Sequence, residues 1–346
     1  MKRYSRWLNA LFKIGVVVLL GLTLYQEIGT RQSAASLWDA FRSGIQGQLW
    51  PLAFVILVLM WINWVLETLK WRVFTKAFFR STFRQSLEGV LAGVTLSLIT
   101  PQRLGDYGGR LLRVPAPYKW QAVSATVMSN LCQLIVLLGA GALGLGYFTA
   151  HYWPEGWKAA GDWFPLMIGL PLLLLAGLSF LRPLGRRILR LPALRRFREL
   201  GRQLRSLDGP TLMKGLGLAA LRYATYSTQY YLLLCLFGIA PSAEAAFAGI
   251  ATIFFIQSSV PLPPLLGLLA RGEIALLVWG VFDANEFSIL AATLSLFIIN
   301  LFIPALLGLV IVVKTDVLKP FSYENNYEQN RAIDDPRGTS DGFRHS

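Results

Sequence analysis

Residues 87–113 read LEGVLAGVTLSLIT followed by PQRLGDYGGRLLR, so an apolar run passes directly into a charged stretch. As a helix, the fourteen residues of the run 87–100 would rise only about 21 Å, whereas the hydrocarbon core of a bilayer is roughly 30 Å thick. The run is therefore too short to cross alone as an untilted helix. Something must continue it or turn it back, and the break falls at Pro101.

The composition predicts an all-α polytopic membrane protein. Of 346 residues, 54% are hydrophobic, mean hydropathy is +0.50, and the apolar residues form long blocks. The net charge of +14 comes from basic residues at the N-terminus and in the loops between these blocks, where topology explains it better than nucleic-acid binding does. Cys132 and Cys235 lack partners at metal-ligand spacing, so we expect no metal and no cofactor.

Six segments are long enough to span a bilayer. They are residues 12–25 with flanks, 49–66, 121–148, 164–181, 212–237 and 287–313. The first follows the basic stretch 1–13 and resembles a signal sequence, but no small-residue cleavage site follows, so we interpret it as an uncleaved helix. Two further apolar regions, 87–113 and 243–282, are broken by prolines and charges.

Loop charges predict the orientation. Basic residues in 2–13, 70–84 and 182–205 mark cytoplasmic faces, which places both termini in the cytoplasm. Each broken region then begins and ends on one face, residues 87–119 on the cytoplasmic side and 243–282 on the outer side. We expect two re-entrant helical hairpins of opposite orientation, as in the inverted repeats of secondary transporters. The alternative makes 243–261 and 268–282 two short complete spans.

The first broken region carries the candidate substrate-binding residues Arg103, Asp106, Arg110 and Arg113. Their offsets of three, seven and ten would place them on one helical arc of roughly 80°. Because arginine within a membrane is costly and its fork of donors matches phosphate, this stripe indicates a pathway for a phosphate-bearing group. The alternative is that the outer arginines only reach the interface while Asp106 neutralises Arg103. Four residues are candidate helix breaks: Pro101, Gly105, Gly108 and Gly109.

The second broken region combines a helix break with two charges. The break consists of Pro261, Pro263, Pro264 and Gly267, and the charges are Arg271 and Glu273, which we also predict to bind substrate. A neutralising pair of Arg271 with Glu273 is an equal alternative. If burial leaves one carboxylate unpaired, Asp106 or Glu273 is a candidate proton carrier.

Two cytoplasmic segments complete the organisation. Residues 182–208 alternate arginines with apolar residues, as an amphipathic element on an anionic leaflet would, although a loop that only sets topology is the favoured alternative. Residues 314–346 lack apolar periodicity and are predicted to be a disordered tail. The membrane domain is therefore expected to cover residues 1–313.

The motif TPQRLGD at 100–106, Arg110, and the later proline-rich break before Arg271-Gly272-Glu273 resemble the flippase-like membrane domain of lysylphosphatidylglycerol synthases. The resemblance covers roughly residues 10–313, with Asp106 in place of a glutamate, while Pro264 and the two leucines after it replace usual glycines. The printed sequence has no counterpart of that family's soluble aminoacyl-transferase domain. The resemblance therefore implies lipid translocation or handling, and not lysyl transfer.

Together these observations predict a multi-pass protein of the bacterial cytoplasmic membrane that moves an anionic or polyprenyl-phosphate lipid between leaflets through a polar cleft formed by the two hairpins. One alternative is an enzyme that modifies a lipid headgroup, although the only histidines, His151 and His345, lie outside the predicted membrane core. Another is an accessory subunit without transport, docked through residues 182–205.

Overall fold

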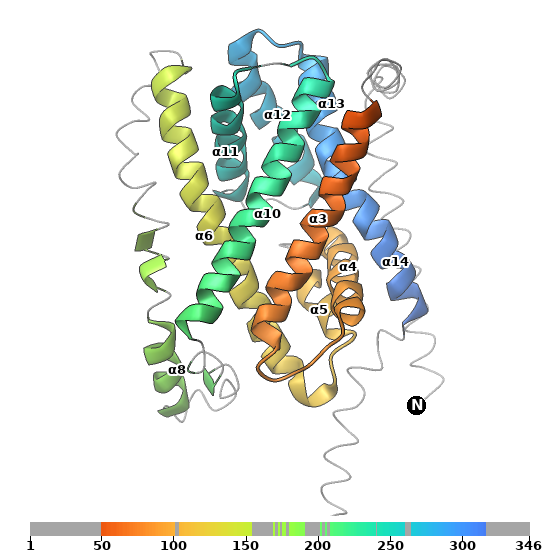
Figure 1. Ribbon diagram of the computed structural model, residues 1–346, viewed down its shortest axis with the longest axis vertical. Coiled ribbons are helices and arrows are strands. Elements are labelled where there is room, and N and C mark those ends of the chain that lie inside the picture. Colours follow the sequence, from red (N-terminus) through yellow and green to blue (C-terminus); the bar gives the residue numbers. More distant parts are fainter. Residues whose placement is uncertain are drawn as a thin grey trace, which may run out of the picture.

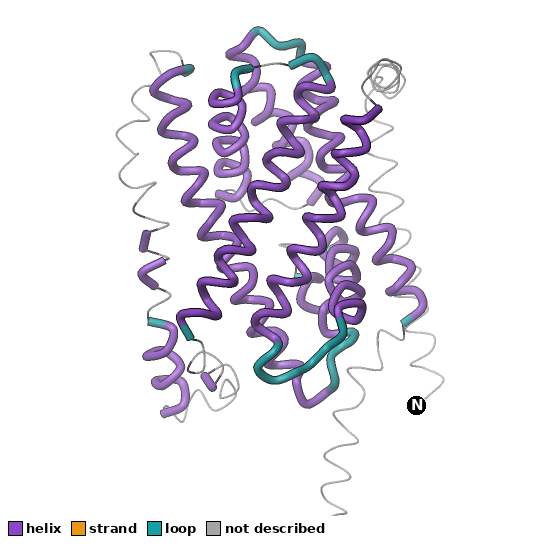
Figure 2. Tube along the Cα trace, viewed as in Figure 1, coloured by secondary structure: helices purple, strands orange, loops and turns teal. Residues whose placement is uncertain are grey.

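The computed structural model describes residues 50–100, 104–153, 208–239, 241–259 and 264–315, together with 180–190 and isolated positions between 169 and 205. Within these residues the fold is helical, with no strand. Figure 1 shows long helices running between the two ends of a bundle, and Figure 2 shows that most described loops lie at those ends. The predicted span 12–25, most of 164–181, and the tail beyond 315 lie outside the described residues.

The helices follow one another in this order: α3 (Trp50–Thr75), α4 (Phe83–Ile99), α5 (Gly105–Leu111), α6 (Lys119–His151), α8 (Leu181–Arg190), α10 (Gly209–Leu236), α11 (Ala243–Ser259), α12 (Pro264–Trp279), α13 (Glu286–Phe297) and α14 (Ile303–Lys314). Short 3₁₀ turns precede α6 (Ala116–Tyr118) and follow α12 (Gly280–Phe282). A π-helical turn, η6 (Ile298–Phe302), joins α13 to α14, so these three elements form one continuous helical rod.

Three helical segments of the described residues are long and apolar enough to cross a membrane: Trp50–Thr75, Ala116–His151 and Glu286–Lys314. They correspond to the predicted spans 49–66, 121–148 and 287–313. The first is longer than predicted, because α3 continues for more than two turns beyond Leu66. The protein is thus a multi-pass membrane protein. The predicted span 212–237 is the 28-residue helix α10, which carries Lys214 and Arg222.

The two broken regions form two pairs of short helices. Helix α4 packs closely against α5, and α11 packs against α12. In Figure 1 the α4 and α5 pair lies in the lower half of the bundle and the α11 and α12 pair in the upper half. Helix α4 ends at Ile99 and α5 begins at Gly105, while α11 ends at Ser259 and α12 begins at Pro264, so these described helices end or begin near the prolines of the sequence. Whether each pair is re-entrant remains a prediction.

Local sequence signals explain the start of α4. Thr82 and Gln85 form a capping box: the Gln85 amide donates to Thr82 Oγ1 (3.2 Å) and the Thr82 amide donates to Gln85 Oε1 (3.0 Å). At the other end of the bundle, Asn285 caps α13 by accepting from the Phe287 amide. The caps fix where the chain enters these helices, and so fix the register of the faces they bury.

The largest apolar core cluster lies toward the end of the bundle where α10, α11, α12 and α13 meet, and includes Tyr230, Ile253, Trp279 and Ile289. At the opposite end, α4 packs against α5 and α14 with much smaller clusters. Polar side chains fill the space between α3, α5, α6 and α10. That polar region is the candidate site.

Candidate functional site

A buried polar stripe runs along α3. Asn63, Glu67 and Lys70 are spaced by four and three residues, so they share one helical face, and each is at most 3% exposed. This helix packs most extensively against α10. Three polar residues in a membrane-spanning segment are expensive unless they have partners, so the stripe must be satisfied by neighbouring helices.

Glu67 is the centre of an ion network drawn from three helices. Its carboxylate binds Lys70 Nζ at 2.8 Å, Arg110 Nη2 of α5 at 2.8 Å and Arg222 Nε of α10 at 3.3 Å. The side chains of Glu67, Lys70 and Arg110 are at most 4% exposed. One carboxylate therefore holds α3, α5 and α10 together through charge–charge contacts away from water.

Asp106 supplies the second carboxylate. It accepts from Arg110 Nε (2.8 Å) and Nη2 (3.1 Å), and Asn130 of α6 lies at 3.4 Å from its Oδ2. The short helix α5 can place these groups because Gly109 packs against α4 so closely that a Cβ there would overlap the Gly93 backbone. Glycine at this contact lets the seven-residue helix α5 bring Arg110 inward.

Gln133 and aromatic rings complete the surroundings. Gln133 Oε1 accepts from Lys70 Nζ (3.0 Å) and Arg222 Nη1 (3.2 Å). The guanidinium of Arg110 lies 6.0 Å from the ring centre of Trp71, and that of Arg222 lies 5.8 Å from those of Trp64 and Tyr226. We name this set the ion cluster: Glu67, Lys70, Asp106, Arg110, Asn130, Gln133 and Arg222.

The ion cluster carries one uncompensated positive charge, because three cations face two carboxylates. Moreover, Arg110 Nη1 is buried and has no hydrogen-bond partner among the described residues, and Arg222 Nε meets Glu67 only as a 3.3 Å ion pair without a hydrogen bond. A buried donor without a partner costs free energy that an anionic oxygen would recover. The cluster is thus suited to bind an anion.

A chain of amides extends from the ion cluster. Asn63 Nδ2 donates to Asn300 Oδ1 (3.1 Å), Asn300 Nδ2 donates to Gln229 Oε1 (2.6 Å), and Gln229 Nε2 donates to the Ile56 carbonyl (2.8 Å). Asn300 sits in the π-helical turn η6, and single π turns often mark functional positions. Asn63 lies one turn from Glu67, so polar groups continue along α3 beyond the charges.

The first predicted motif is only partly assembled. Asp106 and Arg110 lie in α5 and pair with each other, but α5 contains only residues 105–111, so the expected four-residue helical stripe does not form. Arg113 lies beyond the helix, where its side chain is 41% exposed and binds Glu88 at 2.8 Å. Arg103 and Pro101 lie outside the described residues.

The second predicted motif stands apart from the ion cluster. Arg271 and Glu273 lie in α12, with the Arg271 guanidinium 5.3 Å from the ring centre of Phe297 and Glu273 exposed. Among the described residues, no ion pair or hydrogen bond joins either to Asp106 or Arg110, and the two do not pair with each other. Pro264 begins α12 and Gly267 follows in it; Pro261 and Pro263 lie outside the described residues.

Sequence reasoning missed Glu67, Lys70 and Arg222. The positive-inside pattern uses Lys70 as a marker of a cytoplasmic face, and the predicted span 49–66 ends one residue before Glu67. Arg222 offered a usable signal, because it lies near the middle of the apolar run 212–237, whereas Lys214 lies near its start, and cations deep in an apolar run mark polar sites. No cluster of potential metal ligands occurs among the described residues, and Cys132 is buried and free.

A comparison with known protein families gives one match. Residues 10–308 match a family model described as lysylphosphatidylglycerol synthase TM region, the family that the motifs at 100–110 and 261–273 resemble. The match covers most of the 346 residues, including all the helices of the ion cluster. No curated protein matches the chain significantly.

Proposed function

Because the chain belongs to the lysylphosphatidylglycerol synthase TM region family, its role concerns membrane lipids, and we propose that it moves a phosphate-bearing lipid between the leaflets of the bacterial cytoplasmic membrane. In this proposal the headgroup phosphate binds at the ion cluster while the acyl or prenyl chains stay in lipid. The protein acts as a transporter and performs no covalent chemistry on the headgroup.

The observation that carries the proposal is the excess positive charge of the ion cluster. A phosphate group would neutralise it and accept from Arg110 Nη1, the buried donor that has no hydrogen-bond partner among the described residues, and from Arg222 Nε, whose contact with Glu67 is a 3.3 Å ion pair without a hydrogen bond. Arginine binds phosphate through two parallel donors, so Arg110 and Arg222 are suited to this role. Lys70 adds a point charge from α3.

The cluster is closed in this conformation, since its charged side chains are 18% exposed or less. Transport therefore requires α5 to move relative to α3 and α10, which opens a path for the headgroup. We propose that the α11 and α12 pair, at the other end of the bundle, is the counterpart of the α4 and α5 pair. Arg271 and Glu273 of α12 would contact the headgroup there. Both termini are proposed to be cytoplasmic.

The test is a lipid translocation assay with purified protein in liposomes that contain fluorescent phosphatidylglycerol, polyprenyl phosphate or phosphatidylcholine. We expect wild type to move an anionic lipid across the bilayer. Arg110→Lys keeps the charge but loses the fork, so the rate should fall at least about tenfold, the factor that corresponds to 1.4 kcal/mol. The matched control Arg113→Lys should transport like wild type, because Arg113 pairs outside the cluster.

Two outcomes would refute the proposal. One is wild-type transport no faster than that of empty vesicles for every anionic lipid. The other is an Arg110→Lys rate equal to wild type in protein that is equally well folded. Lipid analysis of cells lacking the protein separates the enzyme alternative, because an enzyme removes a lipid species whereas a transporter redistributes it.

A further inference from the structure

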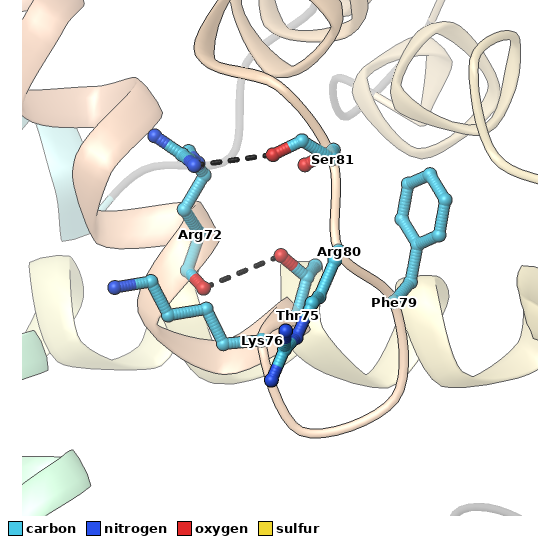
Figure 3. A pocket seen from close by; sticks show the side chains of 6 residues that line it. All are labelled: Arg72, Thr75, Lys76, Phe79, Arg80 and Ser81. Carbon is cyan, nitrogen blue, oxygen red and sulfur yellow. Dashed lines mark hydrogen bonds between the residues drawn. The ribbon is translucent and has the colours of Figure 1, made fainter.

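A surface pocket of about 410 Å³ lies where α3 ends and the chain passes into α4 (Figure 3). It is lined by Arg72, Thr75, Lys76, Phe79, Arg80 and Ser81. Its volume is in the range of small-ligand sites in proteins. Arg72 and Thr75 come from the last turn of α3, and the other four come from the connecting loop.

The loop that forms one side of the pocket is fixed by contacts with other elements. Arg72 Nη2 donates to the Ser81 carbonyl at 3.1 Å across the loop, and the Phe79 ring stacks on Tyr118 at 6.1 Å between ring centres. These contacts tie the connecting loop to α3 and to the turn before α6. The side chains of Lys76 and Arg80 are exposed beside it.

The pocket's three cations have no carboxylate partner among the described residues. The nearby acid, Glu88, binds Arg84 (3.0 Å) and Arg113 (2.8 Å) instead. This arrangement differs from the ion cluster, where every cation contacts a carboxylate. Three unpaired cations around one cavity attract an anion, and two arginines with a lysine match the oxygens of a phosphate.

We propose that this pocket binds the phosphate of an anionic phospholipid headgroup, as a site separate from the ion cluster. The position of the pocket favours a lipid as the source of the phosphate. The pocket begins at the last turn of the membrane-spanning helix α3, and basic pockets at the ends of such helices bind lipid headgroups. Lys70 and Arg72 are two residues apart, about 200° around the helix, so the pocket and the cluster lie on different faces. Lipid binding at the pocket is therefore independent of the transport proposed for the ion cluster.

The experiment measures lipid retention by the purified full chain in mixed micelles, using native mass spectrometry with phosphatidylglycerol or phosphatidylcholine. We expect preference for phosphatidylglycerol, and the double variant Lys76→Gln/Arg80→Gln should lose at least about tenfold in apparent affinity, since each charge-assisted hydrogen bond to the phosphate that is lost is worth roughly tenfold or more. The matched control Lys214→Gln/Arg186→Gln removes the same charge from exposed residues of α10 and α8. It should lose less than about twofold.

Equal losses in the two double variants would overturn the proposal, because the attraction would then be that of net charge alone. Equal retention of the two lipids by wild type would overturn it as well. Displacement by soluble glycerol phosphate at the same concentration would assign a free phosphate compound in place of a lipid. As a second measurement, a photoactivatable phosphatidylglycerol should crosslink to the peptide containing Phe79, and crosslinks confined to other segments would contradict the site.

Discussion

Replacing Glu67 by glutamine tests whether the ion cluster is held by its central carboxylate. The side chain keeps its size but loses the charge that binds Lys70, Arg110 and Arg222. The cluster's net charge rises from +1 to +2 in a buried site. Removing one partner of a buried ion pair costs about 3–5 kcal/mol, because the remaining charge stays buried and unpaired. We expect Glu67→Gln to destabilise the fold by at least about 3 kcal/mol.

The assay is reversible unfolding in mixed detergent micelles, which reports the free energy of unfolding. The matched control is Glu88→Gln, which removes the same charge from a carboxylate that also binds two cations, Arg84 and Arg113. Glu88 and its partners are more exposed, with the Arg84 side chain at 88%, so water screens their attraction. The control should therefore cost about 0–1 kcal/mol.

A third variant separates charge from shape. In Glu67→Gln/Lys70→Gln the net charge of the cluster returns to +1, so the double variant should be more stable than the sum of the single effects predicts, by about 0.5–3 kcal/mol. Equal costs for Glu67→Gln and Glu88→Gln would refute the argument that burial makes this carboxylate central. Strict additivity of the two single substitutions would refute the charge argument as well.

Two other positions give separate predictions. Gly109→Ala should cost about 1–3 kcal/mol of unfolding free energy, because its Cβ would overlap the Gly93 backbone, whereas Gly108→Ala should cost nothing, since its Cβ would have one neighbour at 4.0 Å. Equal costs would mean that the α4 and α5 contact is not as close as described. Asn300→Leu should lower the free energy of unfolding by about 1 kcal/mol, because it breaks the amide chain. The control Ile298→Leu, at an exposed position, should leave that free energy unchanged. Equal effects of the two substitutions in the same unfolding measurement would refute a stabilising role for the amide chain.

Hydropathy and proline placement predicted much of the fold. The apolar runs at 49–66, 121–148 and 287–313 are helices long enough to span, and the described helices α4 and α11 end at Ile99 and Ser259, close to the prolines that predicted their ends. These features depend on local sequence, because segment length and a missing backbone donor act regardless of the rest of the chain. Helix ends were less accurate, since α3 continues past Leu66.

The candidate site was only half predictable. Asp106 and Arg110 are four residues apart, so spacing predicted that they share one helical face, but the partner considered for Asp106 was Arg103, and its pairing with Arg110 was not predicted. Glu67 and Arg222 are far from both, and a positive-inside count treats a lysine near a helix end as a topology marker whether or not it is buried. Lys70 is held inside the bundle by Glu67, one turn away on the same helix, and by Gln133 on α6; the first contact is local, but the second is a tertiary contact that no local pattern contains.

In the proposed transport, the ion network couples anion binding to opening. Helix α5 has seven residues, too few to be stable on its own, so its position depends on its packing against α4 and on the ion pairs of Arg110. A phosphate that competes for the Arg110 guanidinium would weaken its bonds to Glu67 and Asp106. The same event that binds the headgroup would then loosen the contact that joins α5 to α3. In this proposal the free energy of the ion pairs sets how strongly the lipid must bind before the cluster opens.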